Sequence, residues 1–258
     1  FFVRQYIRPV YVQEETFIIA DLPSRPLPKA IAGAGLLAQI VIDKYVDHLP
    51  LHRQQQRFSR DGLNIPYSTI TDWVGSTCTL ITPLYEALKK KVLQSPYLHA
   101  DETPLKVLDK DKKGSTHRGY YWVYHNSLDD LVFFDYQQGR GREGPQQMLE
   151  GYTGYLQTDG YSVYNIVEEK TDATLLHCWA HGRRKFYESV QSDPEQASHA
   201  LTLIGKLYAI ERQAKEENIS ADQIKERREK KSIPVLDELK VWMTQAYMNA
   251  KPKSPLGK

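Results

Sequence analysis

Three features of the sequence predict an α/β fold in which a mixed five-stranded sheet is flanked by helices. Residues 96–180 contain five strand-length runs rich in aromatic and β-branched residues. The first three runs are separated by turn residues, whereas the last two alternate with helix-like segments. The segments on either side carry apolar residues at helical spacing. A meander followed by alternating elements implies a mixed sheet with helices on its faces.

The composition is that of a soluble globular protein. The 258 residues are 41% hydrophobic and 26% charged, enough for one large or two modest domains. No run approaches the length of a membrane span, and the charged N-terminal stretch does not fit a signal peptide. Two cysteines, Cys78 and Cys178, fit a reducing compartment, so we expect a cytoplasmic protein. Because residue 1 is Phe, we expect the chain to be a piece of a longer protein.

The N-terminal part divides into an extended segment, 1–32, and a helical region, 33–95. Prolines at positions 23, 26 and 28 favour an irregular linker in the first. In the second, apolar spacing from Gly35 predicts a helix that Pro50 ends.

A second and a third helix are expected after Pro50. A turn at Asp61-Gly62 separates them, and Ser68 is expected to cap the third, which continues to about residue 91. Helix, glycine turn, helix is typical of a helix-turn-helix, with Arg53 and Arg57 as DNA-binding candidates. Many helical bundles share the pattern, so packing or dimerisation is the alternative.

The predicted sheet region covers residues 96–192, and a further helical region covers 193–258. The expected strands are 97–108, 119–126, 131–138, 154–160 and 173–180, with helices near 142–151 and 161–170. Two basic clusters, HGRRKF (181–186) and KERREKK (225–231), could contact phosphates or could be solvated helix faces.

Two similar phrases, HADETP and QTDGYS, place Asp101 on the first strand and Asp159 at the end of the fourth. After a three-strand meander and a helix, the fourth strand is expected to run parallel beside the first. The two aspartates then meet at one sheet edge, and Gly160 turns the chain away. Because side chains alternate along a strand, Glu102 is expected on the opposite face, in a supporting or structural role.

Paired carboxylates on a rigid scaffold bind Mg²⁺ or Mn²⁺, hard ions that prefer oxygen ligands. Such ions can activate an attacking hydroxyl and stabilise the leaving oxygen of a phosphodiester. The alternative for each aspartate is a turn or cap residue.

Cys178 and His181 form a CxxH motif, which could supply two of the four ligands of a zinc site. The sequence has no second pair of ligands to match it, which favours a structural role. Arg183, Arg184 and Lys185 follow as candidates for DNA phosphate contacts.

Five phrases in this order resemble the transposases of the insertion sequence 66 family: KYVDHLPLHRQQQRF, STITDWV, HADETPLKVL, LQTDGYSVY and HCWAHGRRKF. The likeness runs from about Arg8 to Phe186. It implies a ribonuclease H-like core with a DDE triad and Mg²⁺ for DNA cleavage and transfer. Asp101 and Asp159 match the first two family aspartates, and Cys178 and His181 match a family signature.

The resemblance also implies double-stranded DNA as partner, at the ends of a bacterial mobile element and at the target. A homo-oligomer and a cytoplasmic, nucleoid-associated location are expected by analogy. The chain departs from the family at two places. The third acidic residue is expected to be missing from the end of this chain, with Glu188, and less so Glu211, as substitutes. Gln13 and Thr16 stand where the family carries a cysteine pair.

Three hypotheses about the function of the chain follow. The first is a fragment of a DDE transposase that alone is inactive or weakly active. The second is a non-catalytic DNA-binding or oligomerisation remnant. The third is a stand-alone nuclease that uses Glu188.

Overall fold

The computed structural model describes residues 2–109 and 114–249. Contacts divide the chain into two compact units, Phe1–Ala87 and Leu88–Lys258. The division falls inside the longest helix, α3 (Tyr67–Leu93). No helix in the described residues is long and apolar enough to cross a membrane.

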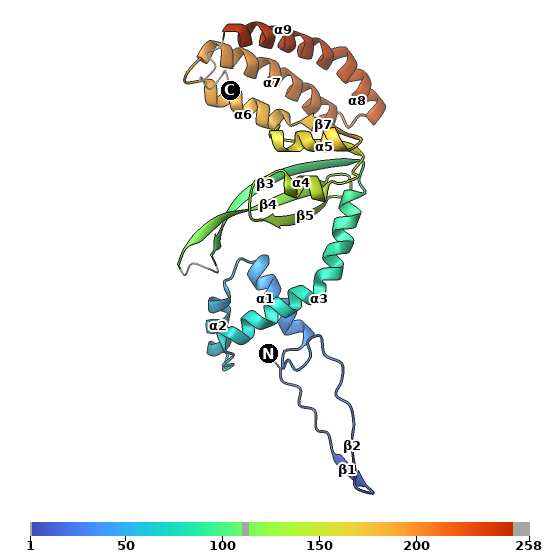
Figure 1. Cartoon of the computed structure of the whole chain (residues 1–258). Helices are drawn as coiled ribbons and strands as arrows, with labels where there is room; N and C mark the ends of the chain where they lie inside the picture. Colours follow the sequence, from blue (N-terminus) through green and yellow to red (C-terminus); the bar gives the residue numbers. More distant parts are fainter. Residues whose placement is uncertain (1, 110–113, 250–258) are drawn as a thin grey trace. The chain divides into compact units, whose positions relative to one another are not determined.

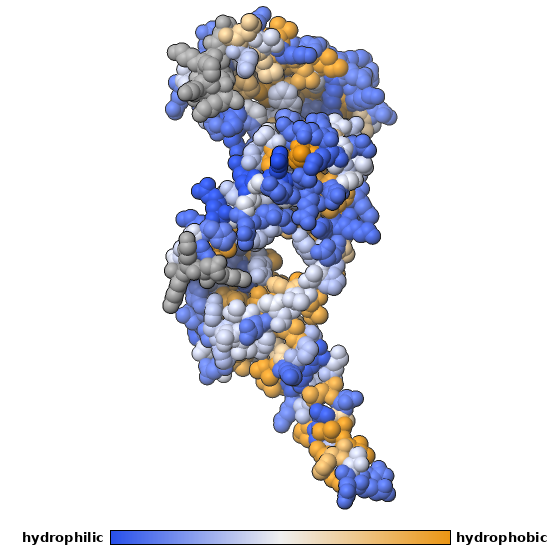
Figure 2. All heavy atoms as spheres, in the orientation of Figure 1, coloured by the Kyte–Doolittle hydropathy of each residue, from blue (hydrophilic) through white to orange (hydrophobic). Residues whose placement is uncertain are grey.

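The first unit begins with a two-stranded antiparallel hairpin, β1 (Val10–Gln13) and β2 (Thr16–Ile19), where an irregular segment was expected (Figure 1). Glu14 and Glu15 form its turn with positive φ values of 47° and 69°. A two-residue turn of this kind usually carries Asn or Gly, so the sequence lacks the usual hairpin signal. Figure 2 shows apolar surface along the hairpin, from the exposed side chains Val10, Tyr11, Val12, Phe17, Ile18 and Ile19.

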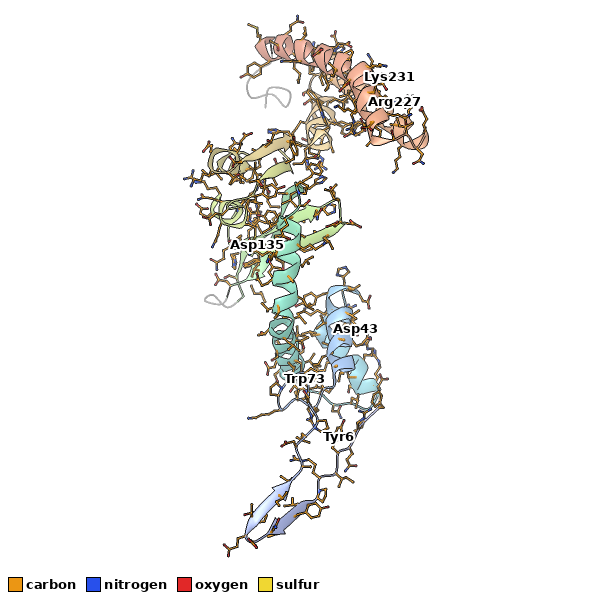
Figure 3. All side chains as sticks on the ribbon, turned by 90° about the vertical axis from the view of Figure 1, so that its right-hand side faces the viewer. Tyr6, Asp43, Trp73, Asp135, Arg227 and Lys231 are labelled. Carbon is orange, nitrogen blue, oxygen red and sulfur yellow. The ribbon has the colours of Figure 1, made fainter. Side chains whose placement is uncertain are left out.

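Three helices complete the first unit: α1 (Ala34–Tyr45), α2 (Leu51–Arg60) and the start of α3. Their apolar faces form a core that includes Leu37, Ile40, Phe58, Ile70 and Trp73. Figure 3 places the labelled Asp43 on α1 and Trp73 on α3.

Two expected helix boundaries in this unit were wrong. α1 ends at Tyr45, because the chain then turns through His48 at a φ of 54°, and Pro50 is the N-cap of α2. Ser68 lies inside α3, whose first turn instead closes with the Ile70 N–H donating to the Pro66 carbonyl at 3.2 Å.

The second unit contains the predicted sheet. Its elements are β3 (Tyr97–Leu108), β4 (Thr116–Asn126), β5 (Leu131–Gln137), α4 (Glu143–Met148), β6 (Gly154–Thr158), the short 3-10 helix η1 (Ser162–Tyr164), α5 (Asn165–Lys170) and β7 (Ala173–His177). The strand order is β5-β4-β3-β6-β7. β3, β4 and β5 pair antiparallel, and β6 and β7 continue parallel to β3. This confirms the expected mixed α/β sheet and the pairing of the first strand with the fourth.

The central strands β3, β4 and β6 bury Leu98, Ala100, Trp122 and Leu156. The Trp122 ring meets the buried Tyr164 ring of η1 edge to face, with 5.9 Å between centroids. This packing fixes the segment that follows β6 against the middle of the sheet, which matters for the position of Asp159.

The expected C-terminal helices are present as α6 (Trp179–Ser189), α7 (Pro194–Glu216), α8 (Ala221–Arg227), a π-helical turn η2 (Arg228–Ser232) and α9 (Ile233–Asn249). Asp193 caps α7, and Ser220 forms a capping box with Gln223 at the start of α8. Leu203, Ile204 and Leu239 form a separate small core.

Candidate metal centre

The pairing of β3 with β6 brings Asp101 and Asp159 to the same level of the sheet. The parallel register aligns Tyr97 with Tyr155 and ends with His99 opposite Gln157. Two residues beyond that pair are Asp101, within β3, and Asp159, directly after the last residue of β6. Since alternate residues of a strand share a face, the two carboxylates come together although they are far apart in sequence.

Glu102 joins the two aspartates. One carboxylate oxygen from each of Asp101, Glu102 and Asp159 lies within 4.8 Å of the other two. Within residues 2–109 and 114–249, this is the only group of three or more His, Cys, Asp or Glu side chains so arranged. Glu102 was expected on the opposite face of β3 from Asp101, in a supporting or structural role, yet its carboxylate lies close to both aspartates.

The orientation of Glu102 agrees with the alternation of side chains along β3. Glu102 does point to the buried side of β3, and its side chain is only 2% exposed. However, β6 stops at Thr158, so no paired strand flanks β3 on that side at this level. Oδ1 of Asp101 accepts the Glu102 backbone N–H at 2.8 Å, so the two residues are also joined through the backbone.

The turn after β6 fixes Asp159. Its Oδ1 accepts the Tyr161 backbone N–H at 2.8 Å. Gly160 between them has a φ of 88°, and a Cβ there would lie 3.2 Å from Nδ1 of His177. Both aspartates thus use one oxygen for a local backbone bond, which orients the second oxygen of each.

The two oxygens of Glu102 differ in their surroundings. Oε1 accepts from Arg140, at 2.7 Å from Nε and also from Nη2. Oε2 is buried and has no hydrogen-bond partner in the described part of the chain. Burial raises the pKa of Glu102, the Arg140 guanidinium lowers it, and Asp159 and Asp101 raise it, so that the pKa stays above its usual value.

These residues fit a hard divalent cation. A buried carboxylate oxygen without a partner is costly, and here it belongs to a carboxylate that lies close to two others. Mg²⁺ and Mn²⁺ prefer such oxygen ligands, and their charge would oppose the mutual repulsion of the three carboxylates.

Glu188 and Glu211 lie outside this carboxylate group. Glu188 is exposed on α6, about 14 Å along the helix axis from Trp179, and its nearest ion-pair partner is Lys185 at 4.0 Å. Glu211 accepts both its hydrogen bonds from Arg228, each at 2.7 Å. The expectation that Glu188 would complete the set is therefore not supported by its position.

Cys178 and His181 form the junction between β7 and α6. The Cys178 N–H donates to the Thr158 carbonyl at 2.8 Å, and the His181 N–H donates to the Cys178 carbonyl at 3.1 Å. These bonds tie the start of α6 to the last residue of β6, next to Asp159. Because these bonds use backbone atoms, the structural role of the two side chains stays a prediction, and neither residue belongs to a group of three ligands among the described side chains.

The predicted DNA-binding residues have different surroundings. Arg183, Arg184 and Lys185 are exposed on α6, and Arg53 is exposed on α2. Arg57 is bound to Asp43, a carboxylate whose side chain is 4% exposed. Arg57 therefore has a structural partner that the sequence did not reveal.

Sequence reasoning also missed Arg140. It lies between β5 and α4, and its contact with Glu102 joins residues 38 positions apart. The flanking Gly139 and Gly141 mark an irregular segment but carry no signal for that partner.

The sheet order and the carboxylates at the end of its central parallel pair define a ribonuclease H-like core. The family model of the IS66 transposases matches residues 29–258, and the chain belongs to this family. It is 31% identical over 250 residues to the uncharacterized protein y4hP of Sinorhizobium fredii, covering 86% of this chain and 44% of that protein. It is 29% identical over 254 residues to y4qI of the same organism, covering 91% and 46%. The chain thus spans about half the length of the curated relatives it matches.

Proposed function

We propose that this chain carries the metal centre of a transposase that cleaves DNA strands at the ends of an insertion sequence and transfers them to a target. The observation that carries this proposal is the convergence of Asp101, Glu102 and Asp159 in a member of the IS66 family, where one Glu102 oxygen is buried and has no hydrogen-bond partner among the described residues. The substrate is double-stranded DNA, and the active form is a homo-oligomer in the bacterial cytoplasm, associated with the nucleoid.

Asp101 and Asp159, together with Glu102, would hold Mg²⁺ or Mn²⁺. When bound, such an ion would supply the charge that activates an attacking hydroxyl and stabilises the leaving oxygen of a phosphodiester. The protein contributes the rigid placement of its ligands: the backbone N–H groups of Glu102 and Tyr161 each hold one aspartate. Arg183, Arg184 and Lys185 on α6 would bind DNA phosphates and set the position of the strand, without reading bases.

The role given to Glu102 replaces the one first expected for Glu188. Glu102 lies in the carboxylate group, whereas Glu188 is exposed and interacts with Lys185. A substitution at each position therefore separates the two candidates for the third carboxylate.

Metal affinity tests the site directly. We expect Asp101→Asn, Asp159→Asn and Glu102→Gln each to lower the affinity for Mn²⁺ at least about tenfold, because losing even a residue that supports a ligand commonly costs that much. Glu188→Gln is the matched control and should leave the affinity unchanged. The measurement is a Mn²⁺ titration followed by electron paramagnetic resonance. Unchanged affinity in both aspartate variants would refute the site, and loss in Glu188→Gln alone would favour the stand-alone nuclease.

A second candidate function, a non-catalytic DNA-binding remnant, is favoured by the α2–turn–α3 arrangement with Arg53 exposed on α2. It predicts salt-dependent DNA binding that does not change with metal or with Asp101→Asn.

The basic cluster on α6 has its own test. If it contacts phosphates, replacing Arg183, Arg184 and Lys185 with Ala should reduce the slope of the logarithm of the DNA-binding constant against the logarithm of the salt concentration by about 2–3. The matched control is Lys230→Ala with Lys231→Ala, from the other basic cluster.

A further inference from the structure

Arg140 is held in one place by two side chains on different segments. Its guanidinium donates twice to Oε1 of Glu102 and lies over the Tyr161 ring, 4.1 Å from the ring centroid. The Tyr161 hydroxyl donates back to the Arg140 carbonyl at 3.3 Å. The Arg140 side chain is 45% exposed, so water could hydrate its charge even without these contacts.

The same contacts reach both sides of the carboxylate group. Tyr161 is the residue whose backbone N–H holds Asp159, and Glu102 is the residue whose N–H holds Asp101. Arg140 therefore links the turn after β6 to the middle of β3, at the level where the two strands are no longer paired. A planar guanidinium suits this position, because it can bind a carboxylate along its edge while its face lies on an aromatic ring.

Arg140 also determines which oxygen of Glu102 remains available. Both of its donors go to Oε1, which leaves Oε2 buried and without a partner among the described residues. Without Arg140, nothing described would hold the plane of the Glu102 carboxylate in this orientation, and the group could rotate away from it. We propose that Arg140, anchored on the Tyr161 ring, is a positioning residue that holds the Glu102 carboxylate beside Asp101 and Asp159 for metal binding. This inference rests on the proposed metal centre.

Charge alone predicts the opposite effect of removing Arg140. A guanidinium next to a cation site repels the cation, so its loss should raise metal affinity if Arg140 acted only through its charge. A residue that orients a ligand commonly changes affinity 10–100-fold when removed, in the direction of loss. Because losing Arg140 also raises the pKa of Glu102, the affinities are compared at a pH where Glu102 is ionised in every chain, and there the sign of the change separates positioning from electrostatics.

The experiment compares Mn²⁺ affinity in the wild-type chain, Arg140→Gln, Arg140→Lys, Glu102→Gln and the double variant Arg140→Gln/Glu102→Gln. We expect Arg140→Gln to weaken binding about tenfold. Arg140→Lys keeps the charge but cannot bind along an edge and stack at once, so it should recover only part of the affinity. The double variant should bind no more weakly than Glu102→Gln, because Arg140 acts through that residue.

Unchanged or higher affinity in Arg140→Gln would overturn the proposal, as would additive losses in the double variant. If Arg140→Gln unfolds, judged by circular dichroism, Arg140→Lys carries the same test, since a wild-type affinity there would also overturn it. Failure of the metal centre itself is distinguishable: Asp101→Asn would then bind as well as the wild type, and both proposals would fall. Loss in Asp101→Asn and Glu102→Gln without loss in Arg140→Gln would remove only the role of Arg140.

Discussion

Single residues in this chain show two outcomes for a buried carboxylate beside an arginine. Asp43 binds Gln39 Nε2 at 2.5 Å through one oxygen and Arg57 through the other, so both oxygens have partners. Glu102 binds Arg140 through one oxygen, and its second oxygen has no partner in the described residues. In the first arrangement, the protein satisfies both oxygens, so Asp43 has a structural role. The second leaves an acceptor available beside two further carboxylates, as a ligand site requires.

Arg57→Ala tests the structural role of the Asp43 ion pair. It would leave a buried charge with one remaining donor, so we expect the free energy of unfolding to fall by about 2 kcal/mol. Fully buried pairs lose roughly 3–5 kcal/mol, but Arg57 is 36% exposed and water can partly replace it. Chemical denaturation measures the change, and Arg53→Ala on the same helix should be neutral. Equal effects of the two substitutions would contradict the ion pair's role.

At the scale of elements, the start of β6 depends on one glycine. Gly154 has a φ of 132°, and a Cβ there would lie 2.5 Å from the Pro96 carbonyl oxygen. Gly154→Ala should therefore destabilise the second unit by about 1–3 kcal/mol and disturb the alignment of β6 with β3. The control is Gly205→Ala in α7, where a Cβ meets no atom within 4 Å, and where alanine should stabilise the helix by roughly 0.5–1 kcal/mol. Thermal unfolding of both variants measures the contrast, and equal shifts would contradict it.

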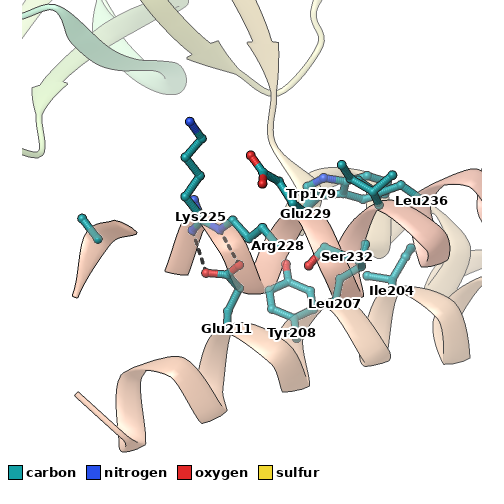
Figure 4. Close-up of a pocket in the computed structure, with 12 residues that line it drawn as sticks. Trp179, Ile204, Leu207, Tyr208, Glu211, Lys225, Arg228, Glu229, Ser232 and Leu236 are labelled. Carbon is teal, nitrogen blue, oxygen red and sulfur yellow. Dashed lines mark hydrogen bonds and ion pairs between the residues drawn. The ribbon is translucent and has the colours of Figure 1, made fainter. Parts of the chain in front are cut away.

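The C-terminal helices are joined by an ion pair whose strength depends on pH. Arg228 on η2 binds both oxygens of Glu211 on α7, beside a cavity of about 540 Å³ (Figure 4). These hydrogen bonds lower the pKa of Glu211 below its ordinary value of 4.5. The lowered pKa means that the stabilisation is present above pH 4.5 and is lost as the pH falls through the folded-state value.

Glu211→Gln should therefore be slightly less stable than the wild type at neutral pH, by under about 1 kcal/mol because the pair is half-exposed. The difference should disappear in acid. Melting temperatures between pH 7 and pH 3 measure it, with Glu216→Gln, an exposed residue of the same helix, as the control. A difference that persists or grows toward pH 3 would contradict the assignment.

The elements also show which features were predictable. The five sheet strands carry local signals, aromatic and β-branched runs between turn residues, and their order follows from that alternation. The hairpin at Val10–Ile19 was missed because its turn consists of two glutamates. The place of Glu102 depends on where the neighbouring strand ends, and the Arg140 contact depends on the fold as a whole. Neither leaves a pattern in the local sequence.

At the scale of the whole molecule, the family assignment and the metal centre rest on different observations. The match to the IS66 transposases covers residues 29–258 and includes parts of both units. The carboxylate group lies entirely within the second unit. Membership of the family therefore would survive the failure of the site, whereas the proposed chemistry would not. The site itself is the claim to test.

The most direct measurement is the anomalous difference map of crystals of this chain soaked in Mn²⁺. We predict a peak within about 2.5 Å of oxygens from Asp101 and Asp159, with Glu102 Oε2 turned toward it and Arg140 still bound to Oε1. A well-ordered site without a peak there, or a peak bound only by other residues, would contradict the account.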